Sequence, residues 1–119
     1  MTKEPMPDKS ASDVRNFFAG KQTEQDLADA FAIASNKFWW VEDNVYDYAE
    51  GTPEYIAART VTDEWEALMG EYEEKIYEIL RNEGITIPQT ARIKVLRPFM
   101  KRNGYIDGSG WWIKDKESK

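Results

Sequence analysis

The chain contains no cysteine and no histidine. Without cysteine it can form neither a disulfide nor a thiolate metal site, and the redox compartment is left open. Without histidine it lacks the imidazole of Ser-His-Asp and Cys-His catalytic sites and the most common zinc ligand. The phosphate-binding patterns G-x-x-x-x-G-K-[ST] and G-x-G-x-x-G are also missing. These absences remove the most common enzyme classes, and we expect no catalytic residue, no metal and no cofactor.

Long hydrophobic runs are missing as well. Apolar stretches such as Phe38–Val41 are short, whereas a membrane helix needs about 20 apolar residues. We see no secretory hydrophobic region either, so we expect a cytoplasmic protein that does not enter a membrane. In contrast, 41% of the 119 residues are apolar and 13% are aromatic, which is enough for one domain with a modest core.

A first long helix is predicted between Thr23 and Gly51. Thr23 can cap the first turn, where Glu24 and Asp26 suit the helix dipole, and Gly51 is a natural stop. The apolar residues alternate spacings of four and three, which aligns them along one side of a helix. These seam residues are Leu27, Phe31, Ala34, Phe38, Val41, Val45 and Tyr48.

A second long helix is predicted to follow at once and to end near Glu83. Thr52 supplies the cap and Pro53 suits the first helical position. Gly70 is a weak point, because a glycine inside a helix costs about 0.5–1 kcal/mol. The turn between the helices is so short that they must fold back as an antiparallel hairpin over residues 23–83. The second seam consists of Ala58, Val61, Trp65, Leu68, Tyr72, Ile76, Ile79 and Leu80.

Shorter elements are predicted on both sides of the hairpin. Residues 1–11 and 115–119 are polar or charged and are expected to be disordered tails. A short helix capped by Ser12 should run to about Ala19. A third helix should open at Pro88 and be kinked or broken at Pro98, with one more turn ending at Asn103.

The last predicted element is a small β-hairpin. β-forming residues at 105–106 and 111–113 flank a turn-rich loop, which is the usual pattern of such a hairpin. The predicted fold is therefore mainly α, within the α+β class. A single compact domain over residues 12–114 would combine the helical hairpin at 23–83 with a basic C-terminal subregion at 85–114.

The net charge of −6 is unevenly distributed. Residues 1–86 carry eight Lys or Arg and nineteen Asp or Glu, a net charge of −11, whereas residues 87–119 carry eight and three, a net charge of +5. One explanation is that the acidic helices and the basic end attract each other within the fold. The other is that one of these regions, or both, binds a partner.

Carboxylates gather on both long helices. Paired carboxylates can do acid–base chemistry or hold Mg²⁺ or Ca²⁺, but no calcium-loop pattern is present, and a charged helix face usually meets solvent or a partner. Asp43 and Asp47, four residues apart, should share a face with Glu50. Like charges repel each other and reduce the stability of the fold. This cost suggests that the acidic residues have a functional role. The predicted partner-binding acidic residues are Glu42, Asp43, Asp47, Glu50, Glu71, Glu74 and Glu78.

Aromatic residues occur as two adjacent pairs, Trp39-Trp40 and Trp111-Trp112. Neighbours on a helix point about 100° apart and neighbours on a strand point to opposite faces, so neither pair can be buried in a single seam. Either the terminal segments cover the outward rings, or these rings anchor a partner, since tryptophan is a favoured interface anchor.

The basic end allows an alternative. Over about residues 71–114 the predicted order of helix, helix, Gly-Tyr-Ile strand and turn resembles the back half of a winged-helix domain, although Pro98 interrupts the place of the recognition helix. The resemblance implies binding of nucleic acid, with the helical hairpin used for homodimerisation. The residues that would then contact phosphates are Arg92, Lys94, Lys101 and Arg102.

The leading hypothesis is a non-enzymatic acidic protein that docks its helical hairpin on a partner protein with a basic surface. Long helices rich in Asp and Glu can imitate the phosphates of nucleic acid. In size and charge the chain resembles small acidic inhibitors from phages and mobile elements, including DNA mimics and anti-CRISPR proteins. That similarity implies an inhibitor of a nucleic-acid-binding enzyme in the cytoplasm of a host cell.

Overall fold

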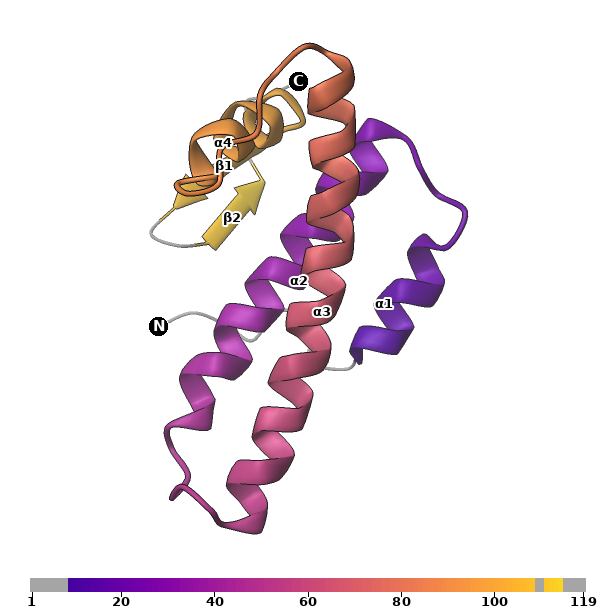
Figure 1. Ribbon diagram of the computed structural model, residues 1–119. Coiled ribbons are helices and arrows are strands. Elements are labelled where there is room, and N and C mark those ends of the chain that lie inside the picture. Colours follow the sequence, from indigo (N-terminus) through magenta and orange to yellow (C-terminus); the bar gives the residue numbers. More distant parts are fainter. Residues whose placement is uncertain (1–8, 109–110, 115–119) are drawn as a thin grey trace.

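Two long antiparallel helices lie at the centre of the computed structural model, which describes residues 9–108 and 111–114 (Figure 1). The fold is mainly α with one small antiparallel sheet, so the predicted class is confirmed. Of the tails expected at 1–11 and 115–119, residues 1–8 and 115–119 lie outside the described residues. The elements are α1 (Ala11–Phe18), α2 (Glu24–Val45), α3 (Pro53–Asn82), α4 (Ile93–Arg102), β1 (Tyr105–Gly108) and β2 (Trp111–Lys114).

The starts of the two long helices follow from local capping. The Thr23 hydroxyl oxygen accepts the N–H of Asp26 at 3.0 Å, and the Asp26 carboxylate in turn accepts the Thr23 hydroxyl at 2.7 Å. Thr52 caps α3 by one such bond, in which its hydroxyl oxygen accepts the N–H of Tyr55 at 3.2 Å. Helix α1 is capped by Ser10 rather than by the predicted Ser12, so the helix begins within the segment that was expected to be a tail.

Helix α2 ends at Val45, one and a half turns before the predicted stop at Gly51. Near its end the Asn44 side chain donates to the carbonyl of Trp40 at 3.0 Å. Such side-chain bonds compete with the helical hydrogen bonds and weaken a helix end. Tyr48 therefore lies in the connecting loop and is 45% exposed, so its assignment to the seam is wrong.

Helix α3 is continuous through Gly70, but one of its predicted seam residues faces solvent. Val61 is 41% exposed, whereas its neighbour Thr62 is fully buried. The Thr62 hydroxyl can be buried because it donates to the carbonyl of Ala58 at 2.8 Å. The predicted seam is thus one residue out of register at this point.

The loop before α4 explains why this helix begins at Ile93 and not at Pro88. Ala91 adopts a positive φ of 55°, which is incompatible with a helix. The Arg92 Nε donates to the carbonyl of Pro88 at 2.9 Å and closes the loop.

Helix α4 continues through Pro98, so of the predicted kink or break the break does not occur. Buried side chains lie on both sides of the proline, with Leu96 before it and Phe99 and Met100 after it. We attribute the continuity to this burial, which holds both halves of the helix in place. The end at Asn103 agrees with the prediction.

Strands β1 and β2 pair antiparallel, with Asp107 opposite Trp112, which confirms the predicted β-hairpin. The sheet is joined to α2 by Asn36. Its side-chain oxygen accepts the Trp112 N–H and its side-chain nitrogen donates to the Trp112 carbonyl, both at 2.9 Å. This pair of bonds fixes Trp112 against helix α2.

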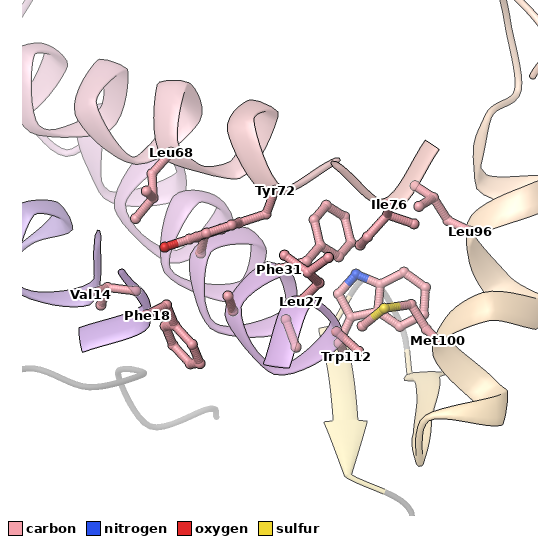
Figure 2. Packing of buried hydrophobic residues seen from close by; sticks show 14 of the residues in the cluster. Val14, Phe18, Leu27, Phe31, Leu68, Tyr72, Ile76, Leu96, Met100 and Trp112 are labelled. Carbon is pink, nitrogen blue, oxygen red and sulfur yellow. The ribbon is translucent and has the colours of Figure 1, made fainter. Parts of the chain in front are cut away.

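The core runs between the two long helices and is covered from two sides. Figure 2 shows Val14 and Phe18 of α1 at one side, and Leu96, Met100 and Trp112 at the other, with residues of α2 and α3 between them. The short helix α1 and the C-terminal segments therefore bury opposite sides of one core.

Candidate functional site

The two ends of the helical hairpin differ in how their charges are paired. We call residues 42–61 the distal end, and we call the opposite end, with α4, β1 and β2, the proximal end. Figure 1 shows the α2–α3 loop projecting beyond α1, α4 and the sheet.

At the proximal end Arg102 links the start of α2 to the end of α3. Its guanidinium donates to both carboxylate oxygens of Glu24, at 2.6 and 3.0 Å, and to both of Glu83, at 3.1 and 2.7 Å. The hydrogen bonds from Arg102, joined by one from Asn103, hold the pKa of Glu24 below its usual value, and those from Arg102 to both carboxylates raise the pKa of Arg102. This predicted phosphate contact is instead part of the fold.

Other basic side chains near α4 are also engaged. Arg92 lies over the ring of Tyr77, with its Cζ 5.2 Å from the centroid. Arg97 pairs with Asp107 at 3.2 Å. Of the four predicted phosphate contacts, only Lys94 and Lys101 are exposed without a described ion-pair partner.

The ion pair of Lys114 with Asp29, at 3.7 Å, again joins the basic end to an acidic helix. The Tyr105 hydroxyl donates to the same carboxylate at 2.8 Å, and burial, followed by this hydrogen bond, raises the pKa of Tyr105. These contacts support the explanation that the acidic helices and the basic end attract each other within the fold.

The carboxylates of the distal end outnumber its cations. Between Phe38 and Ala58 the chain carries five Asp or Glu and no Lys or Arg. The next cation along the chain, Arg59, pairs with Asp63 at 3.2 Å. Within the described ranges none of the five carboxylates forms an ion pair. They are Glu42, Asp43, Asp47, Glu50 and Glu54.

The placement of these carboxylates differs from the prediction. Asp43 belongs to the last turn of α2, but Asp47 and Glu50 lie in the loop that follows, so the predicted i, i+4 pair on one helix face does not form. All three are exposed, and Glu42 is half-buried. The structure therefore gathers them at the end of the hairpin and not along its side.

Large apolar side chains are exposed among these carboxylates. Tyr46 is 71% exposed and Ile56 is 58% exposed, and Tyr48 and Val61 are exposed as well. The exposure of Tyr48 and Val61 was not predicted, because the sequence pattern places both of them in the seam. Exposed tyrosines are of interest here because tyrosine is enriched at protein-binding surfaces.

The acidic residues predicted on α3 divide into two groups. Glu71 pairs with Arg15 of α1 at 2.6 Å and so helps to hold α1 in place. Glu74 and Glu78 are exposed and form no ion pair with another described residue. They lie in the second half of α3, away from the distal end.

The four predicted aromatic anchors also divide. Trp112 is buried against Phe31, with 6.2 Å between ring centroids, so its role is structural. Trp40 and Trp111 are half-buried against each other at 6.3 Å. Trp39 is 46% exposed and is the one of the four that most resembles a free anchor.

Among residues 9–108 and 111–114, no three carboxylates converge as a metal-binding group would require. In the same ranges no helix has the length and apolar character needed to span a membrane. Comparisons of the chain with protein-family models, with curated proteins and with solved structures found no match.

Proposed function

We propose that this protein is a non-enzymatic inhibitor that docks the distal end of its helical hairpin on the basic surface of a nucleic-acid-binding enzyme, in the place of nucleic acid. One observation carries the proposal. The distal end presents five carboxylates with no ion-pair partner among the described residues, beside tyrosine and isoleucine side chains that are exposed.

The charge at the distal end suits a surface that normally binds nucleic acid. Duplex DNA carries about one negative charge per 1.7 Å of its axis, and its partners meet it with lysine and arginine. The carboxylates of the distal end are not engaged by described cations, so no internal ion pair has to break when a basic partner arrives. Their mutual repulsion would be relieved by that partner, which favours binding.

The exposed apolar side chains can supply binding affinity, which charge alone does not provide. Charged pairs at the rim of an interface mainly steer association, whereas buried aromatic anchors carry much of the affinity. Tyr46 and Ile56 are the most exposed of these side chains and are the best placed to be buried by a partner. We therefore expect charge to guide docking and these two residues to hold the complex together.

The proposal has consequences for the cellular location and for the oligomeric state of the protein. An inhibitor of this kind, like those of phages and mobile elements, would act in the cytoplasm where nucleic-acid enzymes work. A homodimer through the distal end is disfavoured, because a symmetric contact would bring two acidic surfaces together.

Binding of nucleic acid through the basic subregion is less well supported. Arg102 would have to leave Glu24 and Glu83, and Arg92 would have to leave Tyr77. A gel-shift titration with duplex and single-stranded DNA at low salt separates the two proposals, and we expect no shift.

The test is a pull-down from nuclease-treated bacterial lysate with two matched variants. Asp47→Lys/Glu50→Lys and Glu74→Lys/Glu78→Lys each reverse two exposed carboxylates, the first pair at the distal end and the second on α3. We expect wild type and the α3 variant to capture the same protein, the distal variant to lose it, and added duplex DNA to displace it. Capture that survives the distal reversal, or that duplex DNA cannot displace, would contradict the proposal.

A further inference from the structure

A cavity of about 420 Å³ lies where α2, α3, α4 and the sheet meet. It lies at the proximal end, and its size falls in the range of about 300–1,000 Å³ that small-molecule sites occupy. Of the residues that form the distal end, none lines it.

Most of the cavity wall is apolar and aromatic. The residues that line the cavity come from α2, α3, α4 and the sheet, so the cavity depends on the packing of the C-terminal segments against the helical hairpin. Trp39 stands at the exposed side and Trp112 at the buried side. The apolar lining residues are Phe31, Trp39, Met69, Ile93, Leu96 and Trp112.

Three polar side chains share this wall, namely Ser35, Glu73 and Asp107. The Asp107 carboxylate is engaged by Arg97. Glu73 is half-buried and forms no ion pair within the described part of the chain. The cavity therefore holds one carboxylate whose charge is not balanced by a described cation.

Glu73 is also held in a fixed position. The Tyr77 hydroxyl donates a hydrogen bond to its Oε2 atom, and burial raises the pKa of Tyr77 further above its ordinary value of 10. The Oε1 atom accepts no hydrogen bond from another described residue. Arg92 lies over the ring of Tyr77 and donates its Nε–H to Pro88, without pairing with Glu73.

We infer that this cavity binds a small organic cation, an amine that carries an aromatic or branched aliphatic group. The positive head would meet the Glu73 carboxylate and the faces of the aromatic rings, because a cation is attracted both to an opposite charge and to the π-face of tryptophan or phenylalanine. The apolar group would lie against Met69, Ile93 and Leu96. This inference does not depend on the proposed docking function.

The test is a titration of the intact ¹⁵N-labelled protein with 2-phenylethylamine, followed by NMR. We expect saturable shifts of the indole N–H signals of Trp39 and Trp112 and none for Trp65, which is buried outside the cavity. The matched ligand 2-phenylethanol has nearly the same size and no charge, and it should bind about tenfold more weakly or worse.

Two variants locate the binding. Glu73→Gln keeps an oxygen that can accept from Tyr77 but removes the charge, and should weaken amine binding about tenfold. Glu74→Gln removes the neighbouring exposed charge, which does not line the cavity, and should leave the affinity within about twofold. Trp39→Leu, at the exposed side, should weaken binding without unfolding the chain.

The inference is overturned if the alcohol binds as tightly as the amine, if Glu73→Gln and Trp39→Leu both bind like wild type, or if millimolar amine produces no saturable shift. The Asp47→Lys/Glu50→Lys variant should retain amine binding. A failure of the cavity site and a failure of the docking surface can therefore be told apart.

Discussion

The two ends of the helical hairpin carry the same kinds of acidic residue in different surroundings. At the proximal end Glu24 and Glu83 are bound by Arg102. At the distal end Asp47 and Glu50 are exposed and have no described ion-pair partner. The net charge of −6 describes neither end. The difference teaches that a carboxylate can be assigned to folding or to binding only when the cations that the fold brings near it are known.

The largest difference between the ends should be in packing. Phe99 at the proximal end is 1% exposed and Tyr46 at the distal end is 71% exposed. We expect Phe99→Ala to lower the free energy of unfolding by about 3–5 kcal/mol, because it leaves a cavity in the core. Tyr46→Ala should change it by less than about 0.5 kcal/mol. Urea denaturation of both variants tests this, and equal effects would mean that the two ends are packed alike.

The next difference should be in ion pairing. Arg102→Ala removes bonds to two carboxylates and should lower the free energy of unfolding by about 1–2 kcal/mol, a modest loss because solvent screens these partly exposed ion pairs. The neighbouring Lys101→Ala is the control, since Lys101 is exposed and forms no ion pair with a described residue, and should have little effect. The difference in the free energy of unfolding between the two variants should become smaller as the salt concentration rises, because salt screens the ion pairs. A loss for Lys101→Ala equal to that for Arg102→Ala would contradict the comparison.

The paired carboxylate at the proximal end should also give the protein a specific acid sensitivity. The pKa of Glu24 is lower in the folded chain than its ordinary value of 4.5, chiefly because Arg102 binds it, so the unfolded chain takes up a proton more readily. The stabilisation is complete above the ordinary value and is lost as pH falls through the lowered folded value. We expect Glu24→Gln to flatten the loss of stability as the pH falls below the ordinary value of 4.5.

The control for that measurement is Glu50→Gln at the distal end, where no described cation binds the carboxylate. Thermal melts at several pH values should give this variant the slope of wild type. If Glu24→Gln also kept the wild-type slope, the Arg102 contact would contribute nothing to stability in acid.

The smallest expected effect is a gain in stability at the distal end. Asp47→Lys/Glu50→Lys should raise the free energy of unfolding by about 0.5 kcal/mol at low salt, because it relieves repulsion among like charges. The matched change Glu24→Lys/Glu83→Lys should lower it, since it places two further cations beside Arg102. Denaturant midpoints that fall for both variants would show that the distal carboxylates stabilise the fold.

The features that the sequence predicted well depend on residues close together in the chain. The caps at Thr23 and Thr52 each involve a partner three residues away. The antiparallel turn and the β-hairpin are similarly local. The early end of α2 and the exposure of Val61 were not predicted, because the seam assumed that every apolar position would find a partner. At the distal end no other described element covers the hairpin (Figure 1).

The candidate site was harder to predict, because charge pairing depends on distant residues. Arg102 and Glu24 are 78 residues apart, and Asn36 and Trp112 are 76 apart. Nothing in the local pattern distinguishes Glu71, which pairs with α1, from Glu74, which has no described ion-pair partner. The predicted acidic residues were therefore a mixture of structural and exposed groups.

The most direct test of the difference between the ends is an NMR titration of the ¹⁵N-labelled protein with a short polylysine peptide at low salt. We expect saturable amide shifts within residues 42–54, which added salt reverses and which the Asp47→Lys/Glu50→Lys variant lacks. Shifts centred instead on Glu24, Asp29 and Glu83 would show that the proximal carboxylates are the available ones and would contradict the account.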